Sequence, residues 1–267
     1  MLKRRVITGL WGVPLVIVAI WFDEPLPWFT LLAVIVGLLA IVEFYKITGI
    51  LRVVPLTVFG LIWTLLFIIE PHWNYDNAKA VLLASAVVIS LLLRVPLRAV
   101  KFSLADWAWS LAGIIYVGLL LGLLVSLRIE AGREWLYLVI LCTFASDTAA
   151  FFIGRAVGRH KLAPSISPGK TWEGAAGGLL GAVIISLLFT LSTPVQLPIS
   201  YGEAIMLGVL ISVCGQIGDL AESKLKRHKA IKESGTLMPG HGGLLDRLDS
   251  ILFAGLAVYI YYTFFVI

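Results

Sequence analysis

Long apolar stretches constrain the fold of this chain more than any other feature. Nine of them approach the roughly 20 residues that a helix needs to cross a bilayer. They lie at 6–22, 28–48, 54–69, 78–93, 104–127, 135–154, 171–192, 201–221 and 248–267. Hydrophobic residues make up 60% of the chain and charged residues 14%, against about 25% charged residues in soluble domains. The pattern predicts an all-α, polytopic integral membrane protein with about nine transmembrane helices.

The first stretch begins like a signal peptide, after Lys3, Arg4 and Arg5, but no small-x-small cleavage site follows it. We therefore expect a retained first span. The N-terminus and the loops on its side of the membrane contain eighteen lysines and arginines, and the loops on the opposite side contain three. The positive-inside rule then predicts a cytosolic N-terminus, and an odd number of spans puts the C-terminus outside. We expect the protein in the cytoplasmic (inner) cell membrane.

The chain divides, as we interpret it, into an N-terminal region of about five spans, residues 1–130, and a C-terminal catalytic region of about four spans, residues 131–267. Ten of the eighteen cations fall in two cytosolic loops of the second region, 155–171 and 222–247. Function, and an active site on the cytosolic side, are expected there. The net charge of +5 favours anionic lipid head groups as partners; nucleic acid is not expected, because no soluble basic domain carries it. Cys142 and Cys214 lie inside apolar stretches and are expected to be packing residues.

The first of these loops ends in "SPGKTWEG", whose Lys170 and Thr171 resemble the end of an ATP-binding P-loop. That motif needs a glycine five residues before Gly169 and a strand leading into it. Position 164 is Pro164, and the segment 155–164 is predicted to be turn-rich rather than a strand. The motif is rejected, and another phosphate-binding arrangement is expected. The glycines that follow are predicted to let helices approach closely; they are Gly174, Gly177, Gly178 and Gly181.

Four acidic residues lie inside or at the ends of the predicted spans: Asp147, Glu173, Asp219 and Glu222. An ionisable group at membrane depth is costly, and it indicates a functional site or a water-filled cavity by default. For Glu173 and Glu222 a plain helix-end position at the interface remains an equal interpretation.

The second loop ends in "PGHGGLLDRLDSILF". A glycine-rich turn that opens a helix offers backbone N–H donors and a positive dipole end to a phosphate. Asp246 and Asp249, three residues apart, would then lie on one helix face. Their charges repel unless a cation lies between them, and Mg²⁺ is the simplest candidate. The alternative is that each complements the helix N-terminus, a contribution of about 0.3 to 1 kcal/mol. For His241, a metal ligand, an acid and a hydrogen-bonding turn residue all remain open.

The segment 223–249, "SKLKRHKAIKESGTLMPGHGGLLDRLD", resembles the signature of the phosphatidate cytidylyltransferases, also called CDP-diacylglycerol synthases. The pattern runs S-x-hydrophobic-K-R, four residues, K-D, then a loop to P-x-H-G-G-hydrophobic-x-D-R-hydrophobic-D. The matching positions are Ser223, Lys226, Arg227, Lys232, Pro239, His241, Gly242, Gly243, Asp246, Arg247 and Asp249. Glu233 stands where the family usually has Asp, and Met238 where it has Leu, Ile or Phe. The stretch from Asp147 through "SPGKTWEG" looks like a second common region.

The resemblance implies an enzyme of phospholipid biosynthesis that joins phosphatidate to CTP or dCTP, giving CDP-diacylglycerol and pyrophosphate. It also implies Mg²⁺, a second, monovalent ion such as K⁺, and the option of a homodimer. Metal binding is assigned to Asp219, Asp246 and Asp249, and catalysis to these three with Lys226. Substrate binding is assigned to Ser167, Lys170, Thr171, Ser223, Arg227, His241, Gly242, Gly243 and Arg247. The roles of Asp147, Glu173 and Glu233 stay open.

Two other functions remain as alternatives. A transporter of a phosphorylated solute could line its path with Asp147 and Asp219, although such proteins often carry inverted repeats and this chain shows no repeat. A membrane cytidylyltransferase or kinase acting on another lipid is the second alternative.

Overall fold

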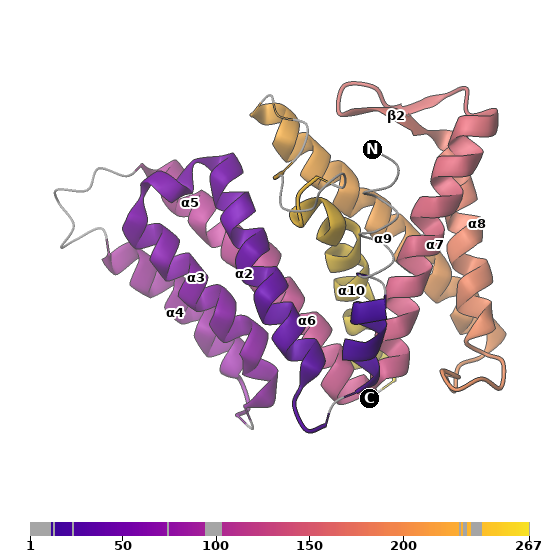
Figure 1. Ribbon diagram of the computed structural model, residues 1–267, viewed down its shortest axis with the longest axis horizontal. Coiled ribbons are helices and arrows are strands. Elements are labelled where there is room, and N and C mark those ends of the chain that lie inside the picture. The colour runs from indigo at the N-terminus through magenta and orange to yellow at the C-terminus, as the bar shows by residue number, and fades with distance from the viewer. Residues whose placement is uncertain are drawn as a thin grey trace. The chain divides into compact units, whose positions relative to one another are not determined.

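The structure is a computed structural model, and it describes residues 12, 14–22, 24–73, 75–93, 103–229, 231, 234–235 and 242–266. Apart from one β-hairpin, the regular structure of these residues is helical (Figure 1). Among them, six helical stretches are long and apolar enough to cross a membrane. They are Trp28–Thr48, Val54–His72, Leu104–Ala131, Arg133–Val157, Tyr201–Arg227 and Leu245–Phe265. The chain is a multi-pass membrane protein, as its composition predicts.

The predicted count of nine spans is met only in part. Two of the predicted spans are shorter apolar helices, α4 (Ala78–Leu92) of 15 residues and α8 (Trp172–Leu188) of 17. The first predicted span, 6–22, lies partly outside the described residues. The count and the cytosolic N-terminus therefore stay predictions.

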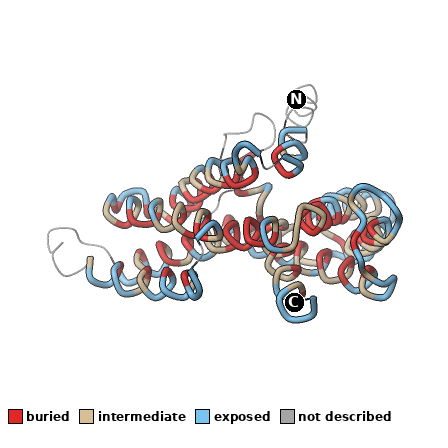
Figure 2. The backbone as a smooth tube through the Cα atoms, turned by 90° about the horizontal axis from the view of Figure 1, so that it is seen from below, coloured by how far each residue is buried: buried red, intermediate tan, exposed pale blue. Residues whose placement is uncertain are grey.

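Many helices carry both exposed and buried residues along their length (Figure 2), and many of the exposed residues are large and apolar. Ile35, Val81, Leu180 and Ile184 are each about 60% exposed. In water such residues would form apolar patches far larger than soluble monomers expose. They are the surfaces that a lipid bilayer would cover.

The chain forms two compact units, one of residues 1–126 and 233–246 and the other of residues 127–232 and 247–267. We call them unit 1 and unit 2. The predicted cytosolic loop 222–247 contributes to both, because its residues 233–246 belong to unit 1. The predicted domain division at residue 130 stays a prediction.

Unit 1 is built from α2 (Trp28–Thr48), α3 (Val54–Ile69), α4, α5 (Leu104–Gly113), η3 (Ile114–Leu119) and α6 (Leu120–Ser126), with the short turns η1 (Ile50–Arg52) and η2 (Glu70–His72). α2 ends at Gly49, whose φ of 85° continues the chain out of the helix. α5 begins with a capping box between Ser103 and Asp106. The fully buried Tyr45 joins these helices, since its hydroxyl donates to the Ser110 carbonyl at 2.9 Å.

Unit 2 contains η4 (Leu127–Ala131), α7 (Arg133–Val157), α8, α9 (Tyr201–His228) and most of α10 (Leu245–Phe265). The glycines of α8 lie against α7: a Cβ on Gly178 would come within 2.9 Å of the Ser146 carbonyl oxygen. The predicted close helix approach is therefore confirmed. Cys142 is buried and unbridged, and its thiol donates to the Ala182 carbonyl of α8 at 3.5 Å. It packs as predicted.

A two-stranded hairpin is an addition to the predicted all-α fold. Strands β1 (Lys161–Ala163) and β2 (Ser167–Thr171) pair antiparallel, with Lys161 opposite Thr171 and Ala163 opposite Ser167. The expectation of no strand within 155–164 is wrong. The glycine, proline and charged residues of this segment indicate turns when they are read locally. β1 forms because its partner strand, β2, follows a turn. The Ile166 N–H closes that turn by donating to the Ala163 carbonyl at 3.2 Å.

Candidate active site

The junction between the hairpin and α8 is held by two side chains. Thr171 ends β2 and caps α8, its buried hydroxyl accepting from the Gly174 N–H at 3.1 Å. Glu173, the second residue of α8, accepts from the backbone N–H groups of Arg159 and His160, and its Oε1 lies 2.6 Å from His160 Nδ1. A hydroxyl that caps a helix is less available to a substrate than the sequence suggests. Both residues therefore fix the backbone on either side of Lys170.

Lys170 forms an ion pair with Asp219 of α9. Its Nζ lies 2.6 Å from Asp219 Oδ2, and the Ser223 hydroxyl donates to Asp219 Oδ1 at 3.3 Å. About a quarter of the Lys170 side chain and a third of the Asp219 side chain are exposed. An ion pair open to solvent can exchange partners when a more strongly charged ligand arrives, so this is a place where a phosphate can be received.

The end of α9 also contacts the hairpin through Arg227. Its Nε donates to the Ile166 carbonyl at 3.0 Å, and a terminal nitrogen donates to the Ile231 carbonyl at 3.4 Å. The hairpin, with Ser167 at the start of β2, thus lies beside the end of α9. These contacts join the hairpin to the cytosolic loop 222–247 predicted from the sequence, in which Arg227 and Ile231 lie.

Three carboxylates interact electrostatically within unit 2, each from a different helix. Asp147 comes from α7, Asp219 from α9 and Asp249 from α10. Asp249 is buried, and its Oδ1 accepts from the Ser250 N–H at 2.8 Å. Like charges in such positions repel, and nearby cations reduce that repulsion. Three cations lie within electrostatic range of these carboxylates: Lys170, Lys226 and Arg247.

Close packing of α9 on α10 brings Asp219 and Asp249 together. A Cβ on Gly218 would come within 2.5 Å of the Asp249 carbonyl oxygen, so a residue other than glycine would push the two helices apart. On the next turn of α9, Glu222 and Lys226 form a buried ion pair. Lys226 is thereby positioned near Asp249 with its charge partly matched.

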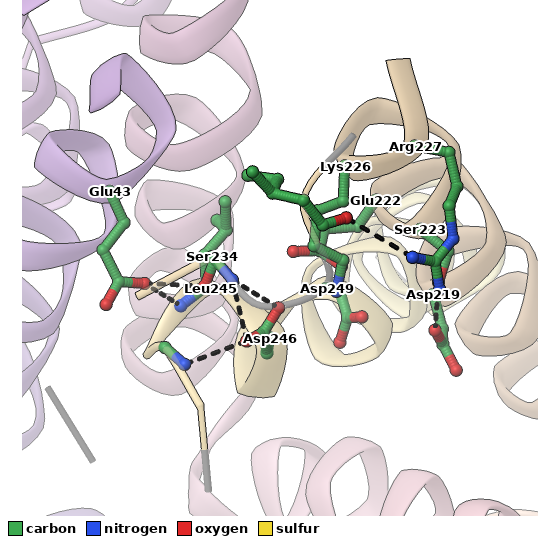
Figure 3. A network of polar contacts seen from close by, with 12 residues as sticks. Glu43, Asp219, Glu222, Ser223, Lys226, Arg227, Ser234, Leu245, Asp246 and Asp249 are labelled. Atoms are coloured by element: carbon green, nitrogen blue, oxygen red, sulfur yellow. Dashed lines mark hydrogen bonds and ion pairs between the residues drawn. The ribbon is translucent and has the colours of Figure 1, made fainter. Parts of the chain in front are cut away.

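Asp246, in unit 1, has different surroundings. Its carboxylate accepts from the backbone N–H groups of Ser234, at 3.1 Å, and Gly243, at 2.9 Å (Figure 3). Gly242 has a φ of 80°, a conformation that glycine adopts without strain. The start of α10 and the residues before it are therefore joined through Asp246, in addition to the metal role that the sequence predicts for it.

Sequence reasoning missed Glu43, a buried carboxylate in α2. One of its oxygens, Oε2, accepts from the Ser234 hydroxyl at 3.0 Å and from the Leu245 N–H at 2.9 Å (Figure 3). The signal was present, because Glu43 lies inside the apolar stretch 28–48, and an acid within such a stretch indicates function by default. The same rule selected Asp147.

The structure allows a limited test of the predicted metal site. His241 lies outside the described residues. Within the described parts of the chain, no three histidine, cysteine or acidic side chains are spaced to hold a metal ion together. Mg²⁺, however, is commonly held by one or two carboxylates, with water and substrate phosphates as the other ligands. The carboxylate oxygens of Asp219 and Asp249, which interact electrostatically and have lysine and arginine side chains within range, are of the type that fits that chemistry.

Comparisons with known proteins identify the family of the chain. Residues 3–265 match the model of a family described as "Cytidylyltransferase family". A phosphatidate cytidylyltransferase of Bacillus subtilis is 32% identical over 257 residues, 94% of each chain. One of Staphylococcus saprophyticus is 41% identical over 153 residues, covering 57% of this chain and 58% of that protein. One of Staphylococcus haemolyticus is 36% identical over 191 residues, 71% and 72% of the two chains. The chain belongs to the cytidylyltransferase family.

Proposed function

We propose that this protein is a phosphatidate cytidylyltransferase: it transfers the cytidylyl group of CTP to phosphatidate and releases CDP-diacylglycerol and pyrophosphate. The observation that carries the proposal is the identity of 32% with a protein of that name over 94% of both chains. The cluster of carboxylates and cations in unit 2 supports it, because both substrates are polyanions.

The reaction needs charge neutralisation more than proton transfer. A phosphate oxygen of phosphatidate attacks the α-phosphorus of CTP, and the bond from that phosphorus to the oxygen bridging to the β-phosphate breaks. The attacking oxygen is already ionised, so no strong general base is required. Positioning and electrostatic stabilisation are then the main contributions of the protein. Lys170, released from Asp219, would bind phosphate, and Lys226 and Arg247 would offset the charge that develops.

Arg227 has a more limited part in this proposal. Its guanidinium already donates to two backbone carbonyls, and a planar fork with five donors can hold these and a phosphate oxygen. Ser167 and Ser223 would supply neutral hydrogen bonds. Thr171 would act through the backbone it caps.

Mg²⁺ completes the proposed site, with Asp219 and Asp249 as its protein ligands. When bound, it would neutralise the phosphate oxygens of CTP and hold them in line. Asp246, one turn before Asp249 on α10, is the third ligand that the sequence predicts, and a second, monovalent ion such as K⁺ is part of the same prediction. An Asp carboxylate has lone pairs left after accepting two N–H groups.

The proposal includes the membrane arrangement predicted from the sequence. Nine spans with a cytosolic N-terminus put the hairpin and the end of α9 on the cytosolic side of the inner cell membrane. CTP would arrive there from the cytosol and phosphatidate from within the bilayer. Use of dCTP and assembly into a homodimer belong to the proposal as well.

Conversion of radiolabelled phosphatidate by the purified protein in detergent micelles tests this function. We expect CDP-diacylglycerol with CTP, no product without divalent metal, and product with dCTP. No product from either nucleotide in the presence of Mg²⁺ would reject the proposal and return attention to the transporter and the other lipid substrates.

A further inference from the structure

Glu43 joins α2 to chain segments nearly 200 positions later. Its Oε2 accepts from the Ser234 hydroxyl at 3.0 Å, and from the Leu245 N–H at 2.9 Å. Leu245 is the first residue of α10. A single carboxylate of α2 is thus hydrogen-bonded both to the start of α10 and to the chain before the glycine turn.

The backbone around this carboxylate is shaped to receive it. Gly235 and Gly243 lie against its two oxygens, and a Cβ on either glycine would collide with them. Oε1 is buried and has no hydrogen-bond partner among the described residues. Burying a charged group with one oxygen unsatisfied is costly. Stability alone is therefore a poor reason for a carboxylate here, where an apolar side chain would pack more cheaply.

The same two short segments, 234–235 and 242–245, are also held by Asp246. It accepts from the N–H groups of Ser234 and Gly243. Figure 3 shows the two carboxylates on either side of this backbone, with dashed lines from both to Ser234. The sequence predicts that the N–H groups of Gly242 and Gly243 face phosphate. In the structure the Gly243 N–H donates to Asp246 instead, so this glycine shapes the turn. Glu43 thus takes up the Leu245 N–H, which would otherwise be one of the free donors at the start of α10.

We propose that Glu43 is a positioning residue for the start of α10 and the glycines before it. By fixing Ser234 and Leu245 it sets the direction of the neighbouring backbone N–H groups, and thereby the rate of cytidylyl transfer, without contacting either substrate. The inference rests on the proposed function for its effect on turnover, and on unit 1 alone for its geometry.

Glu70 provides a matched control within the same unit. It is as buried as Glu43, at 4% exposed against 3%. It follows α3 and pairs with Lys79, 3.4 Å away, rather than with the glycine segments. Loss of a buried carboxylate is common to changes at Glu43 and Glu70, whereas loss of the link to α10 belongs to Glu43 alone.

The first arm of the test is amide hydrogen exchange of the full-length protein in micelles. In Glu43→Ala we expect the amides of residues 243–246 to exchange about tenfold faster, because the Leu245 N–H loses its acceptor. Glu70→Ala should leave them unchanged. Equal exchange in Glu43→Ala and wild type would overturn the positioning role, whether or not the protein makes CDP-diacylglycerol.

The second arm measures kcat for the variants of these two buried carboxylates. Glu43→Ala should lower kcat about tenfold or more, and Glu43→Gln, which keeps an acceptor oxygen, should stay within about threefold of wild type. Ser234→Ala, which removes one of the two donors, provides a milder variant if Glu43→Ala does not fold. Equal kcat values in the Glu43→Ala and Glu70→Ala proteins would overturn the proposal. If wild type makes no CDP-diacylglycerol, the proposed function fails and the exchange arm still decides whether Glu43 positions α10.

Discussion

Glu43 and Asp246 of unit 1 are held differently from Asp219 of unit 2. In unit 1, Glu43 and Asp246 accept from backbone N–H groups, which are fixed partners. In unit 2, Asp219 faces Lys170 and lies within electrostatic range of two other carboxylates. A carboxylate held by amides shapes the backbone. A carboxylate paired with a partly exposed lysine among like charges can exchange that lysine for a metal ion, which leaves the lysine to bind a phosphate.

The largest expected effect tests the unit 2 side of this comparison. Asp219→Asn should lower CDP-diacylglycerol formation about 100-fold or more, because the site loses the charge that pairs with Lys170 and would hold Mg²⁺. The free energy of unfolding should change by less than about 1 kcal/mol, since repulsion from Asp147 and Asp249 is relieved as the ion pair is lost. Activity and thermal unfolding in detergent measure both. Glu203→Gln, at the other end of α9, is the acidic control, and turnover above a tenth of wild type in Asp219→Asn would remove Asp219 from the metal site.

Asp246→Asn sharpens the contrast from the unit 1 side. It should abolish Mg²⁺-dependent turnover while the protein still purifies, as the predicted metal role requires. Unlike Asp219→Asn, it should also lower the free energy of unfolding by about 1 to 3 kcal/mol, since the new amide group faces backbone donors. Equal unfolding temperatures for the two variants would contradict the distinction between the units.

Lys170→Ala comes next in expected size. Turnover should fall about 10- to 100-fold and the KM for CTP should rise, because a phosphate-binding charge is lost. Lys161→Ala changes an exposed lysine of the same hairpin, and it should leave both constants near wild type. Full activity of Lys170→Ala would show that the hairpin does not bind substrate.

Gly218→Ala tests the helix contact that sets the spacing of the two acids. Its Cβ would press on the Asp249 carbonyl oxygen, so we expect a loss of about 1 to 3 kcal/mol in unfolding free energy and a roughly tenfold lower kcat. Gly215→Ala lies one turn earlier on α9, where a Cβ would meet its nearest atom at an ordinary 3.5 Å. Indistinguishable kcat values for the two variants would mean that the spacing of α9 and α10 does not limit turnover.

Ser223→Ala should have the smallest effect. The long hydrogen bond of 3.3 Å to Asp219 orients a carboxylate that Lys170 already holds, so kcat should fall only about threefold. Ser223→Thr, which keeps the hydroxyl, should restore most of it. A loss as large as that of Asp219→Asn would indicate direct contact between Ser223 and the substrate.

Much of the local structure could be predicted from residue order alone. The stretch 28–48 is the helix Trp28–Thr48, and the helices that begin at Ala78, Leu104 and Tyr201 start where the apolar pattern starts. Lipid-spanning helices satisfy their hydrogen bonds internally, so composition and length are enough to find them. The strand β1 was not found, because its pairing depends on β2 beyond a turn and not on its own composition.

The site shows the same division between local and long-range information. Sequence by itself determined the family resemblance and the glycines that let α8 pack closely on α7. It also selected Asp219, Asp246 and Asp249 as candidate metal ligands. Only the tertiary structure decided that Lys170 pairs with Asp219 and that the Thr171 hydroxyl caps α8. It also decided that Glu43 accepts a hydrogen bond from the start of α10. A helix is specified by neighbours three or four positions apart. The partner of a buried charge is set by how distant helices pack, which no local pattern records.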